Sequence, residues 1–228
     1  MHLHIPDGVL PPQVWGPALV VALALLAWSA RARSGETRRE LAYQGALGAL
    51  VLAAMALEVP LGPLEYHLTL LGPLGVLLGP AASFQVLFVV NAILAMLGHG
   101  GFTVVGLNAL VLGAGSALAR PLYSVFARRL APGAALGAST ALVQVVSGAL
   151  WLAVVATALR GDFGIPGTPP PAGRLGLVAG LTFPMWLVGI AAESLVAIGI
   201  GRFLARVRPD LLPGGRPTID GAAGSEAA

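Results

Sequence analysis

The sequence contains no cysteine and no lysine, and it is poor in charged residues of every kind. The absence of cysteine excludes disulfide bonds and thiolate metal sites. The absence of lysine excludes a P-loop for ATP, because that motif requires one. Charged residues make up 10% and hydrophobic residues 57% of the 228 residues, whereas soluble domains carry about 25% charged residues. The composition therefore predicts a polytopic membrane protein.

Long apolar segments predict an all-α fold, a membrane bundle of about seven transmembrane helices. The third segment is short and is interrupted by glycine and proline within 72–75, so we expect it to be tilted, kinked or partly re-entrant, with its backbone covered by protein. Residues 1–208 would form one transmembrane domain that includes an N-terminal segment, 1–10. Residues 209–228 are rich in Gly, Pro and Ala and would form a flexible cytoplasmic tail. The expected helices cover 14–31, 41–58, 66–79, 82–98, 102–119, 133–159 and 176–205.

The arginines predict how the bundle is oriented. With seven spans, every arginine except Arg160 and Arg174 falls on one side, in the segments after the first, fifth and seventh helices. The positive-inside rule then places the N-terminus outside and the C-terminus in the cytoplasm, in the cell membrane of a prokaryote. The net charge of +3 follows from this topology, so we expect the lipid bilayer and no nucleic acid as a partner.

All four histidines fall at the outer face in this topology. His2 and His4 precede the first helix, His67 lies at the start of the third, and His99 lies at the end of the fourth. If the third and fourth segments are not separate spans, His99 moves. Each also has an ordinary interpretation, as an interfacial, capping or disordered terminal residue. Together with nearby carboxylates they predict a mouth that attracts cations. The carboxylates of this face are Asp7, Glu58 and Glu65.

The first two residues form a possible chelate. The Met1 amine, the His2 backbone nitrogen and the His2 imidazole Nδ1 can close two rings around one metal ion. The backbone nitrogen binds only when deprotonated, which favours Ni(II) or Cu(II) in a square plane, with Co(II) also possible. The fourth position stays open for another histidine, and His67 is placed to fill it.

Two stretches resemble a known family. MHLHIPDGVLPPQVW resembles the N-terminal signature of the CbiM/NikM family, the substrate-capture membrane subunits of energy-coupling-factor importers for cobalt and nickel. ASFQVLFVVNAILAMLGHGGFTVVGLNALVLG resembles the family stretch in which an apolar helix runs into a Gly-rich turn. The resemblance covers most of residues 1–200. It implies six or seven helices, an outside N-terminus that folds into the protein, and metal ligands at Met1, His2 and His67, for Co(II) or Ni(II) as cargo.

The sequence departs from the family at three places. The usual His-Ile-Pro-Asp-Gly starts at residue two in the family but at His4 here. Either His4 takes the family slot, or the chelate stays at His2 and His4 adds a further nitrogen; the tie to the free amine favours His2. LEYHL stands where the family has Gly-Thr-Ser-Gly-His, which leaves the surroundings of His67 open. His99 stands where the Gly-rich turn commonly has Asp, and it could add a ligand or alter the turn.

The chain is not expected to be an enzyme, since it has neither a P-loop nor a soluble domain for a nucleotide. The resemblance implies separate partners: a transmembrane coupling subunit, cytoplasmic ATPases and possibly a small accessory membrane subunit. The alternative is a gradient-driven permease that uses Glu193, the one clearly intramembrane carboxylate. An intramembrane hydrolase is disfavoured because HExxH and GxSxG are absent. The sequence does not distinguish nickel from cobalt.

Overall fold

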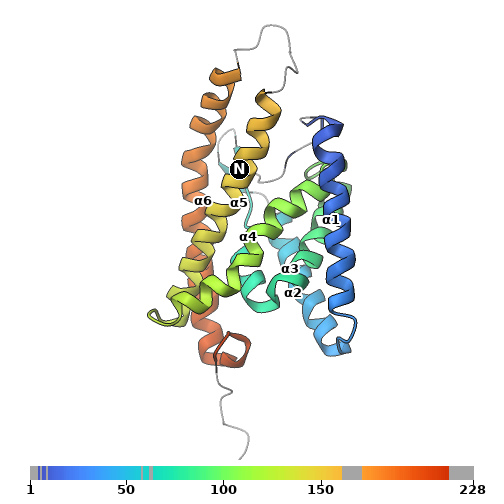
Figure 1. Ribbon diagram of the computed structural model, residues 1–228. Helices are drawn as coiled ribbons and strands as arrows, with labels where there is room; N and C mark the ends of the chain where they lie inside the picture. The colour runs from blue at the N-terminus through green and yellow to red at the C-terminus, as the bar shows by residue number, and fades with distance from the viewer. Residues whose placement is uncertain are drawn as a thin grey trace, which may run out of the picture.

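The computed structural model describes residues 5, 7, 8, 10–57, 59–61, 64–160 and 171–215. These residues form an all-α protein with one small hairpin (Figure 1). The hairpin consists of β1 (Val59–Leu61) and β2 (Leu64–Tyr66), which pair antiparallel. The helices are α1 (Pro12–Ala32), α2 (Arg38–Ala56), α3 (Leu71–Met96), α4 (Val105–Phe126), α5 (Pro132–Arg160) and α6 (Pro171–Val207).

Most of these helices are long and apolar enough to cross a membrane. The described residues include five such helices: α1, α3, α4, most of α5 and the part of α6 from Thr182 to Val207. Helix α2 is shorter and opens with charged residues. A capping box fixes its start, since the Thr37 N–H donates to Glu40 Oε2 (2.8 Å) and the Glu40 N–H donates to Thr37 Oγ1 (3.3 Å).

Helix α3 joins the two segments that the sequence predicts at 66–79 and 82–98, so the described helices number six and not seven. Within it Gly79 has φ 75° and ψ 177°, a conformation that glycine adopts readily, and Pro80 follows. The chain turns back at this point. Gly75 lies against Ser116 of α4 and Gly79 lies against Arg120, whereas Phe84 lies against Gly113. The leg before Gly79 thus runs parallel to α4 and the leg after it runs antiparallel.

The first leg of α3 is short, and this places the preceding residues inside the protein. The eight residues Leu71–Leu78 span about 12 Å at about 1.5 Å per residue, whereas the hydrocarbon core is about 30 Å thick. Residues 67–70 stand before the leg, and His67, Thr69 and Leu70 are buried. The prediction of a helix from residue 66 with His67 at its outer start is therefore wrong, because the helix begins at Leu71 and His67 lies among the helices.

Glycines let this first leg lie close to its neighbours. A Cβ at Gly72 would meet the Thr140 side chain of α5, and one at Gly75 would meet the Ser116 carbonyl and the Ala119 methyl group of α4. Ser116 Oγ also donates to the Leu71 carbonyl (3.2 Å). Helices α4 and α5 therefore cover the backbone of the leg, as a non-spanning segment at membrane depth requires.

Helices α5 and α6 pack along each other (Figure 1). A Cβ at Gly148 of α5 would meet the indole of Trp186, and one at Gly137 would meet Ile198. Helix α6 extends beyond the predicted 176–205 at both ends. A 3-10 turn, η1 (Pro209–Leu211), follows it, and Leu212 is buried against the core.

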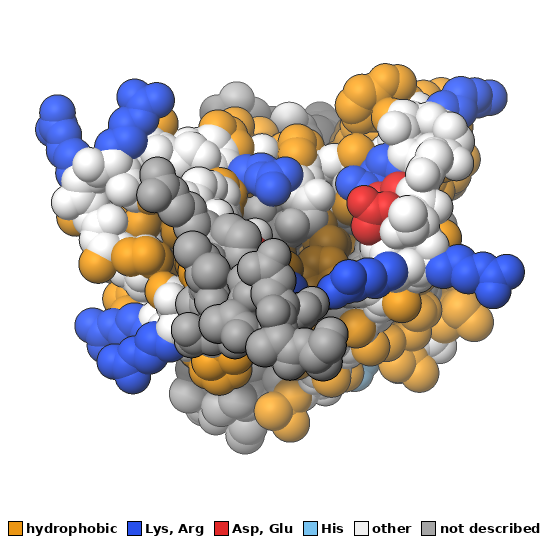
Figure 2. All heavy atoms as spheres, turned by 90° about the horizontal axis from the view of Figure 1, so that it is seen from below, with side chains coloured by type: hydrophobic (Ala, Val, Ile, Leu, Met, Phe, Trp, Pro, Cys, Tyr) orange, Lys and Arg blue, Asp and Glu red, His pale blue; other side chains and the backbone are white. Residues whose placement is uncertain are grey.

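The arginines gather at the end of the molecule opposite the hairpin. Figure 2 shows this end from below, with arginine side chains around its rim. This group comprises the arginines at the end of α1, at the start of α2, at and after the end of α4, and at the end of α6, whereas Arg160 ends α5 and Arg174 lies near the start of α6. The Arg208 guanidinium pairs there with the Asp210 carboxylate at 2.8 Å.

The close approach of α3 to α4 predicts that Gly75→Ala destabilises the protein. The added methyl group would press on Ser116 and Ala119, and such overpacking costs about 1–3 kcal/mol of the free energy of unfolding. Thermal unfolding of the detergent-solubilised protein measures the effect. Gly45→Ala in α2 is the matched control, because a Cβ there meets nothing within 4 Å. Equal Tm values for the two variants would contradict this packing.

Candidate metal site

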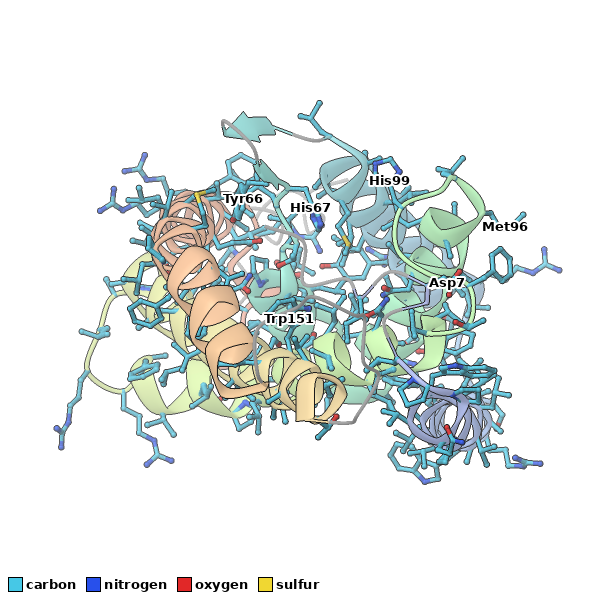
Figure 3. The ribbon with its side chains drawn as sticks, turned by 90° about the horizontal axis from the view of Figure 1, so that it is seen from above. Asp7, Tyr66, His67, Met96, His99 and Trp151 are labelled. Atoms are coloured by element: carbon cyan, nitrogen blue, oxygen red, sulfur yellow. The ribbon has the colours of Figure 1, made fainter. Side chains whose placement is uncertain are left out.

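Two of the predicted site residues, His67 and His99, lie in the described part of the chain (Figure 3). His67 follows Tyr66 and lies toward the middle of the helices, whereas His99 lies in the loop after α3. Met1, His2, His4 and Glu58 lie outside the described residues, as does the side chain of Glu65. Within the described part of the chain no three His, Cys, Asp or Glu residues form a group that could hold a metal ion.

The N-terminal segment is held inside the bundle by an asparagine of α4. The Ile5 N–H donates to Asn108 Oδ1 (2.9 Å), and Asn108 Nδ2 donates to the Ile5 carbonyl (3.1 Å). Ile5 and Asn108 are 1% and 2% exposed. The Ile5 side chain belongs to an apolar cluster with Leu10 and Leu107, against which Trp151 of α5 packs. The Asn108 amide thus makes with Ile5 the pair of backbone hydrogen bonds that a neighbouring strand would otherwise make.

Asp7 provides a second anchor, because it accepts hydrogen bonds from the loop that precedes α4. Its carboxylate accepts hydrogen bonds from the Phe102 N–H (2.8 Å), the Thr103 N–H (2.9 Å) and the Thr103 hydroxyl. The hydroxyl bond, with help from the backbone N–H groups, holds the pKa of Asp7 below its ordinary value. Gly101 allows this approach, because a Cβ there would lie 2.5 Å from Asp7 Oδ1. The Asp7 carboxylate, which the sequence predicted to attract cations, therefore uses both oxygens as hydrogen-bond acceptors for the loop after α3.

His67 lies in the buried turn between β2 and α3. It is 2% exposed and lines a cavity of about 20 Å³ together with Thr69, Gln144 and Glu193, roughly the space of one water molecule. Leu70 in this turn has φ 53°, a left-handed conformation that is uncommon outside glycine. The structure brings His67 together with α5 and α6, from which the sequence predicted no neighbour for it.

A hydrogen-bond network from α5 and α6 surrounds this turn. Glu193 of α6 is 1% exposed and accepts from the Thr69 N–H, the Thr69 hydroxyl (2.7 Å) and the Leu70 N–H (3.1 Å). Gln144 Nε2 of α5 donates to Thr69 Oγ1 (2.7 Å). Tyr66 donates its hydroxyl to the Gly189 carbonyl of α6 (3.1 Å). Sequence reasoning singled out Glu193 as functional, but it missed Thr69, whose position two residues after His67 is the only signal.

His99 lies apart from this network, in the Gly-rich turn that ends α3. Its N–H donates to the Leu94 carbonyl (2.8 Å), and Gly98 and Gly100 on either side have φ 84° and 82°. The side chain is half-buried. The turn directs the chain into the loop that Asp7 holds, so His99 has a clear place in turn geometry.

Comparisons with known proteins agree with this architecture. A cobalt transport protein CbiM from Geobacter sulfurreducens is 27% identical over 218 residues, which are 92% of this chain and 61% of that protein. The chain thus spans about three fifths of the length of this relative. Two crystal structures share the fold at 18% identity. One, described as a transition metal transporter, has a TM-score of 0.76 over 90% of this chain and 93% of that one; the other, a truncated transition metal transporter, has 0.75 over 88% and 97%.

The family whose sequence pattern matches is described as the cobalt uptake substrate-specific transmembrane region, CbiM, and the match covers residues 4–211. That range begins at His4 and takes in all six helices together with the turn that carries His67. The apolar helices and the family agree on a multi-pass membrane protein. The chain therefore belongs to the CbiM family of cobalt uptake substrate-specific transmembrane proteins.

Proposed function

We propose that the chain is the metal-capture membrane subunit of an importer for Co(II) or Ni(II). The observation that carries the proposal is the double anchor of the N-terminal segment at Ile5 and Asp7. Met1, His2, Leu3 and His4 stand directly before Ile5, and a chain extends by at most about 3.3–3.6 Å per residue. If the anchors hold Ile5 and Asp7 in place, the four residues before Ile5 can reach at most about 14 Å from it.

The confined N-terminus supplies the chelate. The Met1 amine, the deprotonated His2 backbone nitrogen and the His2 imidazole give three nitrogen ligands, and His67 supplies the fourth. His4 is the alternative to His2, and the family match that begins at His4 supports it; the chemistry of a free amine next to position two supports His2. All-nitrogen ligation in a square plane suits Ni(II) and Co(II).

The two described groups that could compete for the ion are already engaged. Asp7 gives both carboxylate oxygens to the loop before α4, and Glu193 gives both oxygens to the turn before α3. This disfavours a carboxylate site. It also disfavours the gradient-driven permease, which needs Glu193 as an exchangeable carrier of protons.

The arginines support an orientation with the N-terminus outside. They gather at the end opposite the hairpin (Figure 2), and positive charge marks the cytoplasmic side. If the two legs of α3 count as separate segments, seven segments place the ends of the chain on opposite sides. Energy then comes from a transmembrane coupling subunit and cytoplasmic ATPases. Exposed apolar residues along α1, such as Val20, Leu23 and Trp28, offer the coupling subunit a surface within the bilayer.

The first prediction tests the amine. A single residue added before Met1 converts the amine into an amide, so we expect the protein to lose tight Ni(II) and Co(II) binding although His2 remains. Isothermal titration of the purified full chain measures it, with the same residue added after Ala228 as the control. Unchanged affinity in the N-terminal variant would remove the amine from the site.

A second prediction ranks the two described histidines. His67→Ala should weaken metal binding through the loss of a ligand by more than the about 10–100-fold that loss of a residue orienting a ligand costs, whereas His99→Ala should weaken it by less than that range. Both are read out from metal content after desalting and from the d–d absorption spectrum. The reverse order would make the Gly-rich turn the source of the fourth ligand.

A third prediction tests the anchor at Ile5. Asn108→Ala removes two buried hydrogen bonds, each contributing about 0.5–1.5 kcal/mol, so metal affinity should fall by about tenfold or more, since 1.4 kcal/mol corresponds to tenfold. Asn91→Ala is the matched control, because Asn91 is equally buried but donates to Leu87 of its own helix (2.7 Å). Equal affinities in the two variants would separate the anchor from metal capture.

A further inference from the structure

The Glu193 carboxylate of α6 accepts hydrogen bonds from the turn that carries His67. Its Oε1 accepts from the Thr69 N–H and from the Thr69 hydroxyl at 2.7 Å, and its Oε2 accepts from the Leu70 N–H at 3.1 Å. All three donors belong to residues two and three positions after His67. The two segments stand 124 residues apart in the chain, so α6 reaches across the bundle to hold this turn.

The direction of each hydrogen bond shows that Glu193 serves as an acceptor. Gln144 Nε2 donates to Thr69 Oγ1 (2.7 Å), so the hydroxyl proton of Thr69 points away from Gln144 and toward Glu193 Oε1. The remaining donors are backbone N–H groups at the start of α3, where a helix presents unsatisfied N–H groups and partial positive charge. A carboxylate satisfies this set, whereas an amide would place an NH₂ group against an N–H group.

The turn before α3 contains a backbone conformation that needs support from its neighbours. Leu70 has φ 53°, and a non-glycine residue in this region is strained and persists only when its surroundings fix it. The Leu70 N–H is one of the donors to Glu193. The leg of α3 that follows is only eight residues long, so the carboxylate and the turn together decide where the leg starts and where the His67 imidazole lies.

The same cavity is lined by His67 and by Glu193. Both Glu193 oxygens already accept from donors of the turn, Oε1 from the Thr69 hydroxyl and Oε2 from the Leu70 N–H. Glu193 therefore acts on the ion through His67 and not as a ligand.

We propose that Glu193 of α6, relayed by Thr69 and supported by Gln144, is a positioning residue that fixes the His67 turn in its metal-binding geometry. The inference rests on the proposed function, because it assumes that His67 binds the transported ion. It assigns to Glu193 a part in metal capture that a proton-carrying permease would not give it.

The test uses Glu193→Gln and Thr69→Val in the full chain with its native N-terminus. Thr69→Val keeps the shape of the side chain but removes the hydroxyl, and Thr69→Ser restores it. The matched control is Ser139→Ala, since Ser139 is fully buried and donates only to Leu136 of its own helix (2.9 Å). Ni(II) and Co(II) affinities are measured by titration, and amide hydrogen exchange of residues 67–70 is measured in the metal-free protein.

We expect Glu193→Gln and Thr69→Val to weaken metal binding by about 10–100-fold, the range for residues that orient a ligand, and to speed amide exchange at 67–70. Thr69→Ser and Ser139→Ala should keep both values near those of the unmodified protein. If Glu193→Gln fails to fold, the Thr69→Val and Thr69→Ser pair decides alone.

The outcomes separate the inference from the proposed function. Wild-type affinity in Glu193→Gln and Thr69→Val, combined with loss of metal in His67→Ala, overturns the positioning role and leaves metal capture intact. Metal binding that survives His67→Ala overturns both, whatever the exchange rates at 67–70. Faster exchange without weaker metal binding shows that the network stabilises the turn only, and it also overturns the inference.

Discussion

The pair of hydrogen bonds between the Asn108 amide and the Ile5 main chain is the interaction on which the rest of the candidate site depends. One side-chain amide supplies a donor and an acceptor to a backbone that has neither helix nor strand around it. Without such a partner, the N–H and C=O groups of a buried, irregular segment would cost several kcal/mol in an apolar interior, about 1–3 kcal/mol for each unsatisfied group. The amide therefore makes it possible for the N-terminal segment to enter the bundle at all.

The turn before α3 also has a buried, irregular backbone whose N–H groups need acceptors. Here too an irregular backbone lies at depth among apolar helices, and a polar side chain of a distant helix, Glu193, supplies the acceptors. Glycines at positions 72 and 75 bring α4 and α5 close enough to cover the leg that follows. Ile5 and the turn before α3 thus each obtain hydrogen-bond partners from a polar residue of an otherwise apolar helix.

The sequence predicts the positions of the apolar helices, but it does not predict how deeply the turn before α3 is buried. Apolar segments locate the helices, but the break lies at Gly79–Pro80, at the junction of the third and fourth predicted helices, and not at 72–75, where the sequence places the interruption. The position of His67 was predicted wrongly, because local pattern places a helix start at residue 66 and only the packing of a short leg against α4 and α5 shows that it begins at Leu71. The partners of Glu193 are set by contacts 124 residues away, and no periodicity carries such information. An isolated carboxylate in an apolar helix indicates only that donors must exist.

The long separation between partners sets an order of events during synthesis. The hydrogen-bond partner of Ile5 is synthesised 103 residues after it, and the partner of Thr69 is synthesised 124 residues after it, as part of the last helix. A nascent chain that ends before α6 already contains all four histidines but lacks the carboxylate that holds the turn before α3. The geometry of the turn before α3 is therefore completed only when the final helix is inserted, so an unfinished chain in the membrane lacks the finished candidate site.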